Sequence, residues 1–387
     1  NHKSADVHIR SSYSPFNIPM PPATRKRVVL AAILKPGNDT RMYEKMALSL
    51  AQTGVYQVTV IGRGSAAANH AAVHFFSLGN FGRIGLARLV APLKVLVKCL
   101  QVKPEILIVT THELLIVALI NRILFGTRIW YDIQENYYRN IRFGGAFPPV
   151  ISALLALFVR LKEKATAPFF QGFFLAETGY TRELNFVGRR AIVLENKVVR
   201  APLPTRKKAT EFTFLFSGTL AASTGVFSAI ELVRRIRETG AAVRLLIIGY
   251  AAQTSIQHRL RAASDTLDFI ALEGVHELVP HTRILEAIAE AHAGIVAYPD
   301  SPHTQSAIPT KLYEYLAHQL PIVCINHPTW SACITKWHAG LSIDFENYEP
   351  VEVWNQLRHA HFYPTPPTGV FWKDEEPKLL DALQVDK

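Results

Sequence analysis

Short apolar runs alternate with polar segments of helical periodicity along most of the chain. In residues 27–34 the apolar side chains follow Arg27 without interruption, as expected of a strand buried on both faces of a parallel sheet. Residues 41–53 then repeat apolar side chains at helical spacing, and Gly54 ends this helix. Because residues 57–62 form the next apolar strand, this stretch predicts one strand–helix–strand unit.

The same alternation predicts two successive α/β domains. Further strands are expected at 106–109, 128–132, 173–176 and 191–194, and a helix at 114–124. Residues 196–210 are rich in proline and basic side chains, which indicates a linker between domains. The alternation then restarts with strands at 212–216, 243–249, 293–298 and 321–325 and helices at 226–239, 283–291 and 310–318. This order favours two doubly wound, Rossmann-like sheets with a ligand cleft between their carboxyl edges.

The 387 residues suit such a two-domain division. We expect a leader at 1–24, a first domain at 25–195, a second domain at 196–370 and a final segment at 371–387. The leader is polar and rich in proline and serine, so we expect little order there. The final segment contains an amphipathic helix at 374–385, which can cross back to the first domain.

A formal net charge of +11 narrows the choice of partners. Nucleic acid, an anionic membrane surface and phosphorylated substrates all attract a basic protein, and many proteins are basic without a specific partner. No nucleic-acid-binding motif or basic stripe is present, so we expect no nucleic-acid partner. Residues 81–103 and 147–174 mix basic with apolar side chains, which is typical either of helices on an anionic bilayer or of ordinary helices packed on a sheet.

The sequence gives little support to a spanning segment, a disulfide framework or a metal site. No apolar run reaches the about 20 residues that cross a bilayer. The cysteines are Cys99, Cys324 and Cys333, and none forms a CxxC pair. Because no signal segment is visible either, we expect a reducing, cytoplasmic location, with peripheral contact to the membrane as an option.

The strongest chemical signal is the helix that follows Pro309. Thr310 is expected to cap this helix, which puts Lys311 in its first turn. A cation there opposes the helix dipole unless an anion lies nearby, so Lys311 and the backbone amides suggest a phosphate site. Glu314 lies on the same side and suits the hydroxyls of a ribose. Alternatively, Lys311 and Glu314 form an ordinary ion pair on a solvated face.

A second signal is His112–Glu113, at the end of the predicted strand from Ile106 to Thr111. The carboxyl edge of a parallel sheet is where a histidine can take part in catalysis or orient a substrate. The alternative is a histidine that caps a helix or lies in solvent.

The segment P-x-KLYEYLA at 309–317, followed by Pro-Ile-Val at 321–323, closely resembles the donor-site helix of family 4-type glycosyltransferases of the GT-B fold. Other segments resemble that family in the same order, at 38–45, 131–137, 194–197 and 279–289. The resemblance covers most of the chain. It implies a GT-B architecture in which the first domain binds the acceptor and the second domain binds the donor.

The resemblance also implies the reaction. Relatives transfer a sugar from a UDP- or GDP-type nucleotide-sugar, with retention and without a metal, and the chain has no Asp-x-Asp metal motif. No cofactor is expected beyond the donor, and the acceptor is a glycan, a lipid-linked or a small molecule in polysaccharide or glycoconjugate synthesis. A catalytically weak relative that acts as a scaffold, or a two-lobed binding protein, are the alternatives.

By this resemblance the site residues fall into three groups. The donor side comprises Gly218, Thr219, Ser306, Pro309, Thr310, Lys311 and Glu314. The acceptor side comprises Asn38, Asp39, Arg41 and Glu135. His112 and Glu113 are the catalytic candidates near the transferred sugar.

Three departures from the family pattern bear on the donor site. Ser306 stands where many relatives have a first glutamate. Thr219 and Thr224 replace the arginine and lysine that hold the donor diphosphate in relatives, which removes two charge-assisted contacts of about 1.5–3 kcal/mol each. Lys311, the amides after Gly218 or a basic residue of the other domain would have to compensate.

Overall fold

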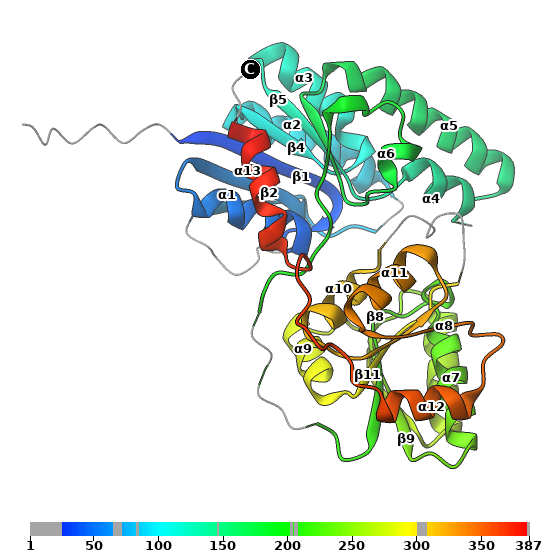
Figure 1. The fold of residues 1–387 in the computed structure, drawn as a ribbon. Coiled ribbons are helices and arrows are strands. Elements are labelled where there is room, and N and C mark those ends of the chain that lie inside the picture. The colour runs from blue at the N-terminus through cyan, green and yellow to red at the C-terminus, as the bar shows by residue number, and fades with distance from the viewer. Residues whose placement is uncertain are drawn as a thin grey trace, which may run out of the picture.

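The computed structural model consists of two α/β domains, one above the other in Figure 1. It describes residues 25–64, 72–82, 85–144, 147–201, 204, 208–299 and 308–384. The predicted leader and Ser306 lie outside these residues. Two parallel sheets, of seven and six strands, confirm the prediction of two Rossmann-like domains.

The N-terminal sheet has the strand order β3-β2-β1-β4-β5-β6-β7. Its strands are β1 Lys26–Pro36, β2 Tyr56–Arg63, β3 Val73–Ser77, β4 Ile106–Val109, β5 Arg128–Ile133, β6 Gly172–Leu175 and β7 Ala191–Val193. Its helices are η1 Thr40–Ala47, α1 Leu48–Gln52, α2 Leu86–Val102, η2 His112–Leu114, α3 Leu115–Phe125, α4 Tyr137–Phe143, α5 Pro149–Thr166, η3 Ala167–Phe169, α6 Tyr180–Glu183 and η4 Gly188–Arg190. The strand order reverses between β1 and β4, so their carboxyl ends open a crevice at this point.

The C-terminal sheet has the order β10-β9-β8-β11-β12-β13 and reverses between β8 and β11. Its strands are β8 Phe212–Thr219, β9 Val243–Tyr250, β10 Ile270–Val275, β11 Ala293–Val296, β12 Ile322–Ile325 and β13 Gly340–Ile343. Its helices are η5 Ala222–Thr224, α7 Val226–Glu238, α8 Thr254–Thr266, α9 His281–Glu290, α10 Thr310–Ala317, α11 Pro328–Trp337 and α12 Pro350–His359. The apolar strands β8, β9 and β11 are buried on both faces, and helices cover them.

The last described helix packs on the N-terminal domain. After η6 (Trp372–Asp374), helix α13 (Glu376–Gln384) lies beside α1 in Figure 1. Trp372, Leu379 and Leu383 are buried in one apolar cluster with residues of η1, α1 and β1. The indole Nε1 of Trp372 donates a hydrogen bond of 2.9 Å to Ser49 Oγ, so this crossing ties the chain end to the first domain.

Most predicted strands appear within a few residues of their predicted bounds, and the differences are local. The helix predicted at 41–53 begins as the π-helix η1, and only its last turn is α-helical. The sequence prediction missed β3, β10, β13, α4, α6, α8, α11 and α12. Several of these elements, such as β3 and β13, are only partly buried, so their apolar pattern is weak.

Candidate active site

Helix α10 begins differently from the prediction. Pro309 occupies the N-cap position with an extended backbone, and Thr310 is the first helical residue. The prediction that the Thr310 side chain caps the helix is therefore wrong. Its hydroxyl instead accepts a hydrogen bond of 3.3 Å from Asn196 Nδ2, which joins α10 to the end of the N-terminal domain.

Lys311 is enclosed by aromatic side chains. Lys311 is 5% exposed, and its Nζ lies 3.7 Å from the ring centroid of Phe216 and 5.2 Å from that of Tyr298. Among the residues that the structure describes, Nζ has no hydrogen-bond partner. Burial lowers the pKa of Lys311 to about 7, against the opposing charge of Glu314. These contacts contradict the alternative of an ordinary surface ion pair.

The turn after β8 lies next to Lys311. Gly218 has a φ of 97°, and a Cβ atom placed on it would lie 3.9 Å from Lys311 Cε. Gly218 and Thr219 are both exposed at this edge. Thr224 Oγ1 donates a hydrogen bond of 2.8 Å to the carbonyl oxygen of Thr219, so its hydroxyl closes the turn. The structure thus brings Gly218 and Lys311 together.

Glu314 has a partner that the sequence analysis did not name. Its Oε1 lies 2.9 Å from His281 Nε2, at the first residue of α9. This contact raises the pKa of His281, first through the hydrogen bond and also through the carboxylate charge. A ribose at Glu314 would therefore share the carboxylate with His281 or displace it.

Lys45 connects the two domains at this place. Its Nζ lies 2.5 Å from Asn196 Oδ1, and the Asn196 amide in turn donates to Thr310. Burial lowers the pKa of Lys45 to about 7, the neighbouring charge of Arg41 adds to this, and the carboxylate of Glu314 opposes it. A chain of polar contacts thus runs from η1 to the start of α10.

Glu177 follows β6 and reaches the segment that enters α10. Its Oε2 accepts a hydrogen bond of 3.0 Å from the backbone N–H of Ile308. The side chain is buried, and burial raises the pKa of Glu177 to about 8. A carboxyl group of the N-terminal domain thereby holds the loop that leads to Lys311.

A cavity of about 370 Å³ opens at the carboxyl ends of β1, β2, β4 and β5. It is lined by Leu34, Lys35, Arg63, Arg88, Thr111, Glu113, Glu135 and Tyr137. The predicted residues Glu113 and Glu135 thus share one cavity with three cations. Arg88 Nε donates a hydrogen bond of 3.2 Å to Glu113, so this carboxylate is already paired.

His112 lies beside this cavity in a largely buried setting. Lys162 Nζ is 3.1 Å from its Nδ1, and Tyr137 packs edge-on at 4.9 Å between ring centroids. Burial is the main cause that lowers the pKa of His112 to about 4, so the imidazole is neutral near pH 7. In the tautomer in which the Lys162 ammonium donates to Nδ1, Nε2 carries the proton. His112 is therefore neither a solvated nor a capping histidine.

The remaining predicted acceptor residues have different environments. Asn38 is exposed at the turn after β1, and Asp39 caps η1 by accepting from the backbone N–H groups of Arg41 and Met42. Arg41 is 2% exposed and pairs with Asp132 at 2.6 Å. The prediction that Arg41 contacts the acceptor is wrong, because its guanidinium is buried and anchors η1 to β5.

Sequence reasoning missed Lys45, Glu177, Asn196 and His281. Three of these residues, Lys45, Asn196 and His281, stood inside segments that carried the family resemblance, but the prediction gave them no role. Glu177 follows a predicted strand as His112 does, and this position was the available signal.

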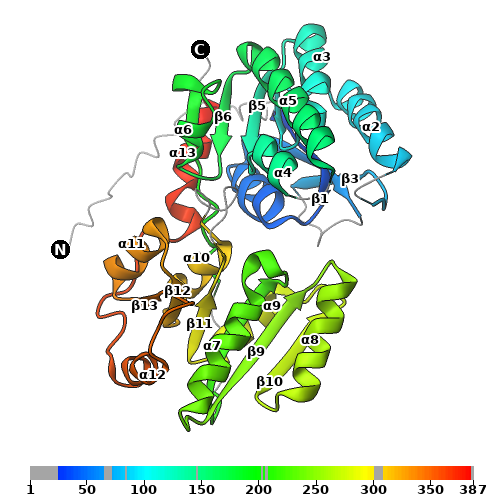
Figure 2. The ribbon, with the colours of Figure 1, turned by 90° about the vertical axis from the view of Figure 1, so that its right-hand side faces the viewer.

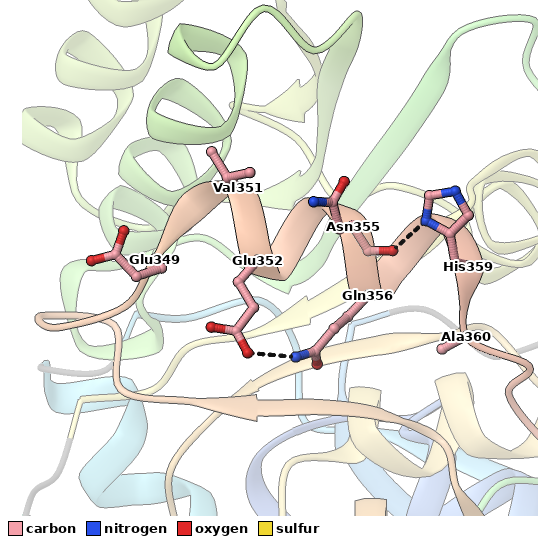
Figure 3. Close-up of a pocket in the computed structure, with 7 residues that line it drawn as sticks. All are labelled: Glu349, Val351, Glu352, Asn355, Gln356, His359 and Ala360. Carbon is pink, nitrogen blue, oxygen red and sulfur yellow. Dashed lines mark hydrogen bonds between the residues drawn. The ribbon is translucent and has the colours of Figure 1, made fainter.

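Figure 3 shows a different hollow, which lies along α12. Its lining residues are Glu349, Val351, Glu352, Asn355, Gln356, His359 and Ala360, all from one helix and its two ends. Figure 1 places α12 at the end of the C-terminal domain that is remote from the N-terminal domain. This hollow lies along the side of one helix and is remote from the residues described above.

Comparisons with known proteins agree with this geometry. Residues 202–352 match the family described as glycosyl transferases group 1. No curated protein matches the chain. Among solved structures, sucrose-phosphate synthase from Thermosynechococcus elongatus superposes with a TM-score of 0.66 at 12% identity, covering 93% of this chain and 97% of that one.

Two further structures have the same fold. WaaG, a glycosyltransferase involved in lipopolysaccharide biosynthesis, gives a TM-score of 0.62 at 13% identity over 93% of this chain and 96% of its own. Anabaena HepE, in complex with UDP and glucose, gives 0.58 at 11% identity over 92% and 95%.

Two parallel α/β domains with polar residues at facing carboxyl edges define the GT-B fold class. The family match covers residues 202–352, less than half of the chain, and supports glycosyl transfer. The second domain is similar to the group 1 glycosyl transferases.

Proposed function

We propose that the protein transfers a sugar, with retention and without a metal, from a nucleoside-diphosphate sugar at α10 to a hydroxyl of an acceptor in the N-terminal cavity. The observation that carries the proposal is Lys311, whose buried Nζ has no hydrogen-bond partner among the described residues and which lies beside the turn at Gly218. A buried ammonium without an anion is unfavourable, and a ligand that supplies one removes this penalty.

The diphosphate of the donor is the anion that fits this place. The amides at the start of α10 and after Gly218 offer further donors at two adjacent chain turns. Lys311 then supplies positive charge in place of the arginine and lysine that stand at positions 219 and 224 in relatives. As the bond between the sugar and the diphosphate oxygen breaks, the acceptor oxygen bonds to the anomeric carbon and its proton passes to the leaving diphosphate. Negative charge grows on this diphosphate during the transfer, and a fixed ammonium stabilises it without a divalent ion.

Glu314 and His112 complete the proposed site. The Glu314 carboxylate accepts from the ribose hydroxyls, with His281 holding its orientation at 2.9 Å. The protonated Nε2 of neutral His112 donates to a hydroxyl of the transferred sugar. Glu113 is paired with Arg88, so we assign it the role of positioning His112 and the cavity wall rather than of a free base.

Calorimetric titration with UDP, GDP and ADP tests the donor site. We expect one nucleotide to bind, and Lys311→Met to weaken it strongly, while Lys336→Met, at an exposed lysine of α11, leaves it unchanged. Binding that is equal in both variants would remove the basis of the proposal.

Two further measurements address the reaction itself. Proton NMR of the product is expected to show the same anomeric configuration as the donor sugar, and inversion would contradict retention. Activity is expected to persist in excess EDTA. Activity that EDTA abolishes and manganese restores would contradict the metal-independent mechanism.

A further inference from the structure

Helix α5 carries its large apolar side chains away from the sheet. The residues that it buries are mostly small or polar, namely Ser152, Ala156, Val159, Glu163 and Thr166. Its exposed side chains include Val150, Ile151, Leu154, Leu157, Phe158 and Leu161, with Leu154 at 64% and Phe158 at 62%. This arrangement reverses the pattern of a helix whose outer face is solvated.

Helix α2 repeats this reversal, and helix α3 also exposes large apolar side chains. Helix α2 buries only Ala91, Val95 and Cys99 and exposes Leu86, Leu89, Val90, Leu93, Val97 and Leu100. Helix α3 exposes Ile116, Ile123, Leu124 and Phe125. Figures 1 and 2 show α2, α3 and α5 on the side of the sheet opposite α13, with α3 in contact with both of the others. We call these exposed apolar residues the three-helix face.

The exposed charges on these three helices have one sign. Helices α2 and α3 contain no acidic residue, and the only one on α5, Glu163, is buried. Lys94, Arg122 and Lys164 are exposed on the same helices. A second copy of the chain, docked through a two-fold axis, would bring these cations toward each other. An apolar layer with an anionic surface matches both the side chains and the charges.

We propose that the three-helix face docks on an anionic lipid bilayer. No helix in the described part of the chain is long and apolar enough to cross a membrane, so the docking is interfacial. The apolar side chains enter the boundary between headgroups and acyl chains, and the three cations contact anionic headgroups. Exposed apolar area of this extent marks an interaction surface rather than an ordinary solvated one.

The N-terminal cavity that we propose for the acceptor adjoins the three-helix face. Arg88 lines the cavity, while Leu86 and Leu89 on the same turn of α2 are exposed in the three-helix face. Docking therefore places the mouth of the cavity near the headgroups, where an acceptor carried on a lipid would present its hydroxyl. This last step rests on the proposed function, whereas the docking itself does not.

Vesicle flotation of the full chain tests the docking. We expect the protein to float with phosphatidylcholine vesicles that contain phosphatidylglycerol, and much less with phosphatidylcholine alone. Leu89→Glu combined with Phe158→Glu is expected to weaken this binding by at least about a hundredfold, since two inserted apolar side chains are lost. The control is Leu278→Glu, at a residue of the C-terminal domain that is 79% exposed, and it should bind as the unmodified protein does.

Three results would overturn the docking proposal. The unmodified protein could fail to float with either vesicle, or the double variant could float equally well. Sedimentation equilibrium without lipid could instead reveal a dimer that the double variant abolishes, which would assign the face to a second copy. Circular dichroism checks that the variants are folded, and nucleotide titration without vesicles separates a failed donor site from a failed membrane surface.

Discussion

Binding of the donor diphosphate should be coupled to proton uptake at Lys311. The pKa of this lysine is lowered to about 7 by burial among Phe216 and Tyr298, so the amine is largely neutral above that pH. A bound diphosphate stabilises the ammonium form and therefore raises the pKa toward its ordinary value. Each binding event above pH 7 must then take up a proton.

The size of this effect follows from linkage. Where Lys311 is deprotonated in the free protein and protonated in the nucleotide complex, the observed nucleotide affinity falls by about tenfold, or about 1.4 kcal/mol, for each unit by which the pH rises. We expect this slope from about pH 7 to about pH 9, and little slope near pH 6, where Lys311 is already charged. The direction is fixed by the lowered pKa of the free lysine: affinity decreases as pH rises.

Titration calorimetry over this range, in buffers of different ionisation enthalpy, measures both the slope and the proton uptake. Lys45 and Glu177 also change charge near this pH, because burial moves their pKa values to about 7 and about 8. The decisive quantity is therefore the difference between the unmodified protein and Lys311→Met, which cannot take up this proton. If Lys311→Met keeps the same pH slope and proton uptake, the ammonium does not hold the diphosphate.

Four other results are expected. Glu314→Gln should weaken nucleotide binding by about 1–3 kcal/mol in calorimetry without changing the melting temperature, because a carboxylate acceptor becomes a neutral one; unchanged affinity would refute the ribose assignment. His112→Ala should lower kcat by about tenfold to a hundredfold in steady-state kinetics with little effect on nucleotide affinity, and an effect on affinity alone would move His112 out of the reacting centre. Because the folded protein raises the pKa of Glu177 to about 8, the stability that its protonated form contributes is lost as the pH rises toward that value. The melting temperature of Glu177→Gln, relative to that of the unmodified protein, should therefore increase between about pH 5 and about pH 9. A difference in melting temperature that stays constant over this range would contradict the argument. Trp372→Ala should reduce the free energy of unfolding by about 3–5 kcal/mol in denaturant titration, because it leaves a cavity in the core of the first domain, and a loss under about 1 kcal/mol would show that the crossing segment packs loosely.

The local pattern of apolar and polar residues was sufficient to predict most of the fold. Strands such as β1 and β4 are buried on both faces, so their apolar residues form continuous runs that are visible without any neighbour. The start of α10 was also locally visible, because a lysine in the first turn of a helix conflicts with the helix dipole. The cap of this helix could not be predicted locally, because the Thr310 hydroxyl accepts a hydrogen bond from Asn196, which lies 114 residues away in the sequence.

The tertiary structure decided which polar side chains serve the site and which serve the fold. Arg41 and Lys45 stand one helical turn apart, yet Arg41 is bound to Asp132 inside the domain and Lys45 reaches Asn196 at the domain boundary. Their partners are 91 and 151 residues distant, so no local spacing could separate the two roles.

The outward direction of α5 has the same origin. Large apolar residues occupy most of its circumference, so periodicity alone cannot say which side meets the sheet. Packing settles this, because the small side chains of Ser152 and Ala156 allow close approach to the sheet while Leu154 and Phe158 are left outside. The sequence alone determined that this segment is an apolar helix with basic residues, and only the packed structure determined that its larger side chains form an open surface.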